Sequence, residues 1–445
     1  MDNRRQPLSN RQMLFLLAED IADRKDNRNS VPFALEIDGA IDAALFCKAY
    51  DQLALEAPCL HVKIETSDGS PEQVFSHDYT GSCALELGID GDLVDQWLLD
   101  EAQKPLIIRE QLSRATLVKR AEDRWVFVLS IHHIVSDQSS FGLLIKRLGQ
   151  IYAGLIGDEE CVPTWFQTGE DIKFPSSSSP EWAEALSAIG SVAVPFGAEL
   201  NAETVAARRV ELAVEPDVLE KLESSARSIL PDVKPMRVRL ALYAVVQALY
   251  LKNATGETEH TIGVPVHGRG DKGVRFAPEL RIEVLPVTIN LDGHLQFGDM
   301  LRSALDSIEA VLARPLVSLG NADLYCTQLN VRGGDFTHFA GMPSRHIQVF
   351  PDCMDPKIAF TLQVDDFEGL GVPRLSLDCN EAVFPEGEIG AWRVAQFENL
   401  LRELASDKLL TDLSLLSEDE TAFVIGSNTQ LASFESDKTV PQLVE

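Results

Sequence analysis

The sequence predicts an α/β (or α+β) protein of two lobes, on three observations. The chain has 445 residues, and a length well above the usual size of one domain favours two lobes of roughly 150–250 residues. Strand patterns and helical patterns occur together in both halves. The stretch TGEDIKFPSSSSPE at 168–181 has the composition of a linker. We therefore place the lobes at 1–175 and 176–427.

The first half begins with a strand pattern in VPFALEID and a turn at DGAID. A helical pattern follows, and then the strand-like CLHVKIE at 59–65. Residues 111–133 predict a hairpin whose two strand runs are joined by the charged turn KRAEDR. Apolar residues then recur at helical spacing from Phe141 to Tyr152, with Ser139 or Ser140 as the expected N-cap. The centre of this half is thus a strand, a loop with two histidines, and an amphipathic helix.

The second half starts with strand material at 205–215 and a helix at 215–229. A long, largely apolar helix follows at 236–256 and ends at Asn253 and Gly256. The remaining elements are expected in this order: strands HTIGVPVHGR and IEVLPVTINL, a hairpin at 359–380 and an amphipathic helix at 387–404. The tail from 415 is polar and weakly patterned, and we interpret residues 428–445 as a linker towards another domain.

Composition and charge disfavour several kinds of partner and location. The net charge is −30, which disfavours nucleic acid or an anionic membrane because both select clustered Lys and Arg. No apolar run approaches the roughly 20 residues of a membrane helix, and MDNRRQPLSNRQ lacks the apolar stretch of a secretory signal. Seven scattered cysteines argue for reduced thiols. We expect a cytoplasmic protein.

The stretch LSIHHIVSDQSS at 129–140 carries the chemistry that the sequence offers. A positioned imidazole is a reasonable general base near neutral pH, and Asp137 lies where a carboxylate can support the loop or a tautomer. The alternative is a pair of strand-end histidines, His132 and His133, beside the start of a helix. A metal site is disfavoured because adjacent histidines rarely bind one ion together. GRGDKG at 268–273 follows a strand but opens no helix, so we interpret it as a loop.

These motifs resemble those of the condensation domains of nonribosomal peptide synthetases, whose signature is HHxxxDG. PLSNRQMLFLL is similar to the family's opening segment through Ser9 and Gln12. LALYAVVQALYLKNATGETEHTIGVPVHGR follows the family's pattern of a long helix, a Thr-Gly turn, a strand and Gly-Arg. LLSEDETAFVIGSNTQ and VPQLVE resemble the passage from a condensation domain into an adenylation domain. The order and spacing of these motifs carry the resemblance, which covers essentially the whole chain.

The resemblance implies two chloramphenicol-acetyltransferase-like lobes in a V, with the active site at their junction and a tunnel across it. Donor and acceptor carrier proteins would deliver phosphopantetheine-tethered substrates, and the acceptor amine would attack the donor thioester. No metal or cofactor of the domain's own is implied. By position, His133 would be catalytic, whereas His132 and Asp137 would be structural supports.

The sequence departs from the family's pattern at several positions. Gln138 replaces the glycine of the signature, and His61 stands where the family has an arginine that pairs with the aspartate. We expect a His61–Asp137 contact to substitute for that pair. Glu283 and Thr288 replace an asparagine and an arginine of a second-lobe motif. DDFEGLG differs from the Asp-Phe-Gly-Trp-Gly of plant-type HHxxxD acyltransferases, which disfavours that branch.

The predicted site is therefore an altered one. Gln138, Ser140 and Glu283 are the candidates for lining the tunnel, and His61 is a candidate support. The leading hypothesis is amide formation between carrier-bound substrates. One alternative is a catalytically degenerate docking platform for carrier proteins or tailoring enzymes. Another is ester formation, or condensation with a free acceptor.

Overall fold

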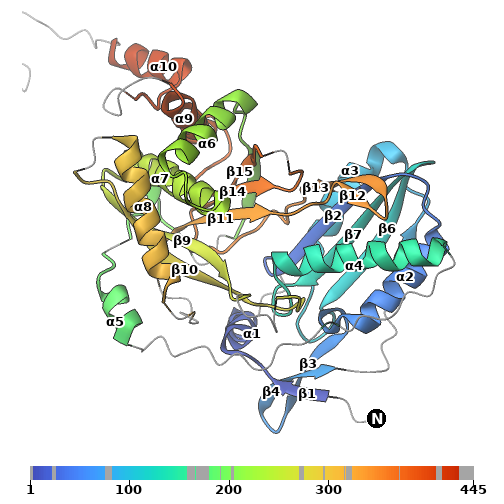
Figure 1. The fold of residues 1–445 in the computed structure, drawn as a ribbon. Helices are drawn as coiled ribbons and strands as arrows, with labels where there is room; N and C mark the ends of the chain where they lie inside the picture. The colour runs from blue at the N-terminus through green and yellow to red at the C-terminus, as the bar shows by residue number, and fades with distance from the viewer. Residues whose placement is uncertain are drawn as a thin grey trace, which may run out of the picture.

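The computed structural model describes residues 4–22, 27–75, 83–157, 166, 180–190, 192–201, 205–269, 275–293, 296–314, 316, 323–369, 371–406 and 413–429. These residues form two lobes, each built on a six-stranded sheet, that stand side by side in Figure 1. A small three-stranded sheet lies below the first lobe.

The sheet of the first lobe has the order β12-β13-β2-β7-β6-β5. Its strands from this half of the chain are β2 (Ser30–Asp38), β5 (Ala84–Glu86), β6 (Ser113–Ala121) and β7 (Arg124–His132). Helices α2 (Ala43–Glu56) and α4 (Gln138–Ile156) cover one face, and α3 (Val94–Ala102) covers the other.

The period-two pattern of β7 decides which face each side chain takes. Phe127 and Leu129 join the core beneath α2 and α4, whereas Val126 and Val128 pack with α3. Both faces of this strand are therefore buried, and its end at His132 is held in place from two sides.

The sheet of the second lobe has the order β10-β9-β11-β14-β15-β8. Its strands are β8 (Ala207–Glu211), β9 (Glu259–His267), β10 (Ile282–Asn290), β11 (Thr327–Gly333), β14 (Phe360–Asp366) and β15 (Arg374–Asn380). The helices of this lobe are α5 (Pro180–Ser187), α6 (Pro216–Ile229), α7 (Pro235–Thr255), α8 (Phe297–Leu312) and α9 (Glu388–Leu404). Most of α7 is buried, and it forms the centre of the larger hydrophobic core.

A segment of the second half crosses into the first lobe. After β11 the chain runs to β12 (His338–Phe339) and β13 (Met342–Ile347), and β13 pairs antiparallel with β2. Arg345 of β13 donates to the buried carboxylate of Glu36 on β2 at 2.6 Å. The two lobes are thus joined by a shared sheet, a connection between distant segments that no local sequence pattern indicates.

The N-terminal helix lies at the base of the junction between the lobes (Figure 1). This helix, α1 (Asn10–Ala22), follows β1 (Arg4–Pro7), which joins β3 (Val62–Ser67) and β4 (Ser70–Phe75) in the small sheet. Short 3₁₀ turns occur at Pro58–Leu60, Gly91–Leu93 and Pro195–Gly197. Within the described part of the chain, no helix is long and apolar enough to cross a membrane.

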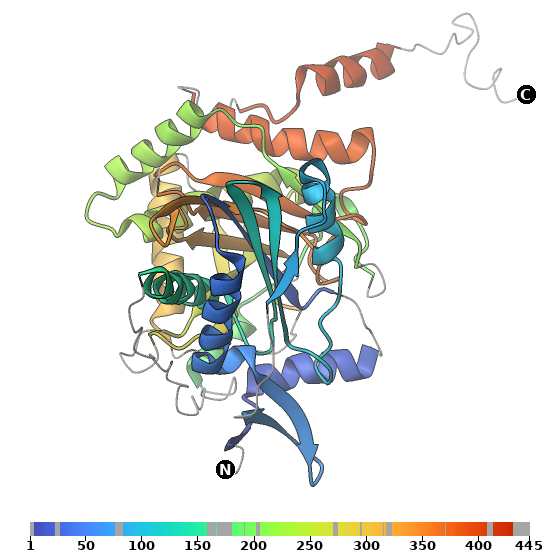
Figure 2. The ribbon, with the colours of Figure 1, turned by 90° about the vertical axis from the view of Figure 1, so that its right-hand side faces the viewer.

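Most elements expected from periodicity are present close to the expected bounds. The expected N-cap of α4 was wrong, because Asp137 caps the helix and Ser140 is its third residue. The tail is more ordered than expected, since α10 (Glu418–Thr429) forms there and projects from the body in Figure 2. The proposed boundary at 175/176 and most of the proposed linker, from 430 onward, lie outside the described residues.

Candidate active site

The two histidines lie where β7 ends and turns into α4. Asp137 and Ser140 form a capping box: the Asp137 carboxylate accepts from the Ser140 amide at 3.1 Å, and the Ser140 hydroxyl oxygen accepts from the Asp137 amide at 3.2 Å. The reciprocal bonds satisfy backbone donors that a helix start would otherwise leave unpaired. They also make the turn between His133 and α4 short and rigid.

His132 is fully buried and its hydrogen bonds define its tautomer. The Ile134 amide donates to Nδ1 at 3.0 Å, so Nδ1 carries the lone pair. Nε2 therefore carries the proton and donates to the Glu19 carboxylate of α1 at 2.8 Å. Both ring nitrogens of His132 take part in hydrogen bonds, so neither is available to accept a proton from a substrate.

His133 has the opposite tautomer and is partly exposed. Its Nδ1 lies 2.9 Å from the Ser136 carbonyl oxygen, which can only accept, so Nδ1 carries the proton. The lone pair is therefore on Nε2. Burial lowers the pKa of His133 from its usual 6.5 and the cation of Arg11 lowers it further, although Asp137 opposes the shift. The neutral form, which can accept a proton, is thus favoured at neutral pH.

Helix α1 covers His133 from one side. The Phe15 ring stacks on the imidazole with centroids 5.3 Å apart, and the Arg11 guanidinium lies 5.2 Å above the same Phe15 ring. Gln12 ties the helix to the histidine loop by donating to the Ile134 carbonyl at 2.9 Å. The opening Ser9–Gln12 motif thus positions a helix against the imidazole.

Asp137 joins the two lobes. One carboxylate oxygen accepts from Arg269 of the second lobe at 2.7 Å, and the other accepts from the Arg281 amide at 3.0 Å. Arg269 also donates to the carbonyls of Ala277 and Glu279. The pair is deeply buried, with side chains 7% and 1% exposed for Arg269 and Asp137.

The expected His61–Asp137 contact was wrong. His61 closes a 3₁₀ turn after α2, and its Nδ1 bonds to the Ala54 carbonyl at 2.7 Å. The oxygens of Asp137 are taken by Ser140, Arg269 and the Arg281 amide. The Asp137 carboxylate is therefore paired with Arg269 of the second lobe and not with His61.

A cavity of about 880 Å³ opens beside α4 at the junction of the lobes. Gln138, Gly142 and Lys146 of α4 lie on one side of it. Residues 330–336 and 338–341, which run from β11 into the crossing segment, also line it. Gln138 lines this cavity.

Two other expected tunnel residues lie elsewhere. Ser140 is fully buried, because its hydroxyl is used in the capping box. Glu283 alternates with Ile282 along β10, and since Ile282 lines the cavity, Glu283 points to the opposite face. There its carboxylate lies 3.8 Å from Arg11.

Sequence reasoning missed two arginines of the site. Arg269 belongs to the Gly-Arg pattern that ends β9, but its partner lies 132 residues away. Arg11 stands next to Gln12 in the opening motif. An arginine at a strand end or in a motif is, by itself, weak evidence for a role in a site. Only the packing of the two lobes brings Arg11 and Arg269 to the histidine loop.

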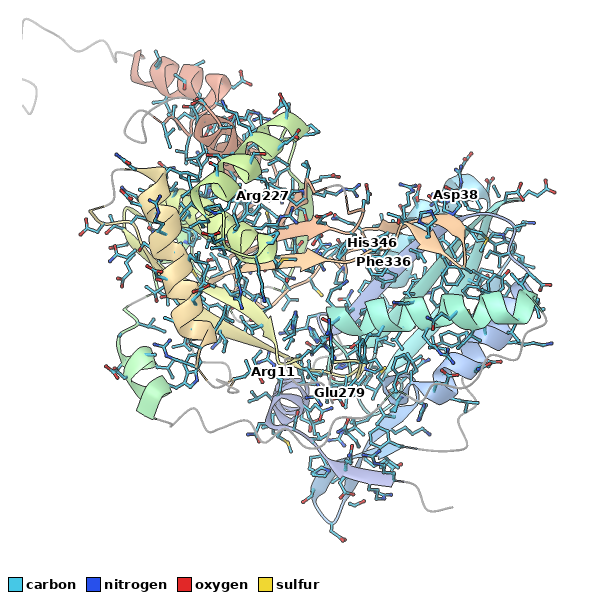
Figure 3. All side chains as sticks on the ribbon, in the orientation of Figure 1. Arg11, Asp38, Arg227, Glu279, Phe336 and His346 are labelled. Atoms are coloured by element: carbon cyan, nitrogen blue, oxygen red, sulfur yellow. The ribbon has the colours of Figure 1, made fainter. Side chains whose placement is uncertain are left out.

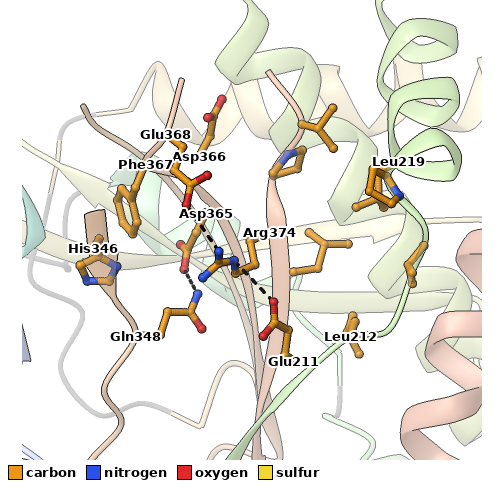
Figure 4. Close-up of a pocket in the computed structure, with 15 residues that line it drawn as sticks. Glu211, Leu212, Leu219, His346, Gln348, Asp365, Asp366, Phe367, Glu368 and Arg374 are labelled. Carbon is orange, nitrogen blue, oxygen red and sulfur yellow. Dashed lines mark hydrogen bonds and ion pairs between the residues drawn. The ribbon is translucent and has the colours of Figure 1, made fainter. Parts of the chain in front are cut away.

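A second hollow, of about 280 Å³, lies at the edge of the second lobe (Figure 4). Its acidic residues have local partners: Arg374 lies 3.5 Å from both Glu211 and Glu368, and Gln348 donates to Asp365 at 3.2 Å. We assign it no chemistry.

The fold and the site geometry place the His133 imidazole, with its Nε2 lone pair unbonded by the described residues, at the junction of two lobes. Comparisons with known proteins give the family. The family model described as "Condensation domain" matches residues 3–320. The chain is 22% identical over 429 residues to a dimodular nonribosomal peptide synthase of Bacillus subtilis (strain 168), covering 90% of this chain and 18% of that protein. It is 24% identical over 463 residues to surfactin synthase subunit 1 of the same organism, covering 99% and 13%.

Solved structures show the same fold. The first condensation domain of the CDA synthetase aligns with a TM-score of 0.77 at 19% identity, covering 93% of this chain and 99% of that one. A mutant of the starter condensation domain of rhizomide synthetase, in complex with C8-CoA, aligns with a TM-score of 0.74 at 20% identity, covering 91% and 96%.

The chain belongs to the condensation-domain family. The expected fold class, two chloramphenicol-acetyltransferase-like lobes, is confirmed. The chain spans less than a fifth of the length of these two curated relatives.

Proposed function

We propose that this chain catalyses amide formation between an acyl thioester on a donor carrier protein and the amine of an acceptor. The observation that carries the proposal is the tautomer of His133. Its Nδ1 proton is held by the Ser136 carbonyl, so the free lone pair is on Nε2 of a partly exposed, neutral imidazole.

The reaction needs a base at one step. Attack of the amine on the thioester carbonyl forms a C–N bond and places a positive charge on the amine nitrogen. Nε2 of His133 accepts a proton from this nitrogen as the tetrahedral intermediate forms. Collapse breaks the C–S bond, and the proton is returned to the departing thiolate, so no other reactant is required.

The remaining residues support this base. His132 packs against Glu19 and α1, and Asp137 holds the turn and the second lobe. The cavity beside Gln138 is the proposed path for a phosphopantetheine arm. Donor and acceptor carrier proteins, a downstream adenylation domain and a cytoplasmic location complete the proposal, with no metal or cofactor of the domain's own.

The test is intact-mass spectrometry of both carrier proteins after incubation with the chain. Wild type should transfer the acyl group, and His133→Gln should lower the rate by about 10²–10⁴-fold with an unchanged melting temperature. His338→Gln is the matched control, since His338 is an exposed histidine that lines the cavity beside Gln138. Wild-type turnover by His133→Gln would overturn the assignment.

The same assay separates the alternatives. Gln138 at the cavity motivates a non-catalytic docking platform. Carrier binding without transfer in wild type, over a panel of acyl donors and acceptors, would favour that role. A hydroxyl acceptor that outperforms its amine analogue would favour ester formation.

A further inference from the structure

Arg11 is a cation at the site whose guanidinium donates no hydrogen bond to the residues that the structure describes. Its side chain is only 19% exposed, and its closest acidic oxygen, on Glu283, lies at 3.8 Å, beyond hydrogen-bond distance. Its Nε is buried without a partner. Across the described residues, none accepts a hydrogen bond from this guanidinium.

This arrangement is unfavourable unless another group completes it. A guanidinium has five N–H donors in a planar fork, which matches a carboxylate with two parallel bonds. Buried donors without acceptors are destabilising. Glu283 of β10, in the second lobe, is 2% exposed and balances the charge of Arg11. At 3.8 Å it does not accept a hydrogen bond from the guanidinium.

The open fork is close to the proposed base. Arg11 lies over the Phe15 ring that stacks on His133, and Gln12 fixes this turn of α1 to the histidine loop. Figure 3 shows Arg11 on α1 at the base of the lobe junction. The Phe15 ring is thus the shared contact between the Arg11 guanidinium and the His133 imidazole.

We propose that Arg11 binds a carboxylate of the acceptor and selects for acceptors that carry one. The inference rests on the proposed function, because it assigns the acceptor class of the same reaction. An acceptor held on a carrier as a thioester has no free α-carboxylate. The carboxylate therefore belongs either to a free amino acid or to the side chain of a tethered acidic amino acid.

Matched acceptor pairs distinguish the two sources. Free alanine is compared with alaninamide, and carrier-tethered aspartate with tethered asparagine, each with the same carrier-bound acyl donor. Wild type should favour the carboxylate member of one pair by about 10- to 100-fold in kcat/KM, and Arg11→Met should abolish that preference. The ratio within a pair is independent of any change in the basicity of His133.

Arg5→Met is the matched control. Arg5 is an exposed arginine of β1 that pairs with Glu65 at 3.0 Å, so its loss should leave the preference unchanged. A preference that Arg11→Met retains would overturn the proposal, as would equal use of carboxylate and amide acceptors by wild type.

A second measurement tests anion binding at Arg11 without turnover. It is needed because a failure of every acceptor to react would count against the proposed function and would say nothing about Arg11. The His133 resonance is followed by NMR with labelled histidine and assigned by its loss in His133→Gln. Carboxylate bound at Arg11 screens its charge, so propionate should raise the titration midpoint of His133, whereas propionamide and sodium chloride of equal ionic strength should not. No difference between propionate and these controls, or the same propionate effect in Arg11→Met, would overturn anion binding at Arg11.

Discussion

Removal of Arg269 tests how the two lobes are joined at the site. In Arg269→Met the stem of the side chain remains, but the guanidinium that bonds Asp137 and the carbonyls of Ala277 and Glu279 is lost. Asp137 is 1% exposed, so water cannot readily replace the missing donor. The carboxylate is left with Ser140 and the Arg281 amide.

The size of the effect follows from this geometry. Removing one partner of a buried ion pair costs about 3–5 kcal/mol. Because Asp137 keeps bonds from both Ser140 and Arg281, we expect the lower end, about 3 kcal/mol, which is roughly 150-fold in a local opening equilibrium. Arg302→Met is the control. Its pair with Asp299 is 57% and 50% exposed, and such pairs contribute about 0–1 kcal/mol.

Native-state hydrogen exchange measures this directly. The Ser140 and Arg281 amides both donate to the Asp137 carboxylate, although they belong to different lobes. Peptides containing these amides should lose protection by about 150-fold in Arg269→Met and remain within about fivefold of wild type in Arg302→Met. Addition of Asp137→Asn should cost less in the Arg269→Met background than alone, because the charge that lost its partner is then removed. Unchanged protection at both amides would refute the reasoning.

Three further outcomes are expected. Because the pKa of His133 is lowered chiefly by burial and the base must be neutral, kcat/KM should fall only below about pH 6.5; an acid limb above pH 7 would contradict this. The pKa of His346 is lowered to about 3, chiefly by burial, so the unfolded chain binds a proton that the folded chain excludes, and stability falls as the pH drops from about 6.5 to about 3. In thermal melts His346→Leu should lose less stability than wild type between about pH 7 and pH 5. An equal loss in the two proteins would contradict the lowered pKa of His346. A Cβ at Gly263 would lie 2.5 Å from the Tyr325 ring, so Gly263→Ala should destabilise by about 1–3 kcal/mol in urea unfolding, unlike Gly142→Ala, which meets open space.

Local pattern was sufficient for most of the secondary structure. The alternation in β7 and the helical spacing after Asp137 depend on neighbours within one element, so the sequence predicts them. The same local pattern identified His132 and His133 as the residues between a strand and a helix. The N-cap was misassigned because serine and aspartate are both good caps, and only the bond from the Ser140 amide to Asp137 distinguishes them.

Other features depend on contacts across the chain, and only the tertiary structure decided them. β13 leaves its own half to pair with β2, where Arg345 donates to the buried Glu36. Arg269, and not His61, reaches Asp137 because the second lobe brings the end of β9 to the start of α4. The sequence by itself determined which residues form the site's strand, loop and helix. Only the packing of the lobes decided which arginines contact the site, because ion pairs depend on distance in space and not on separation along the chain.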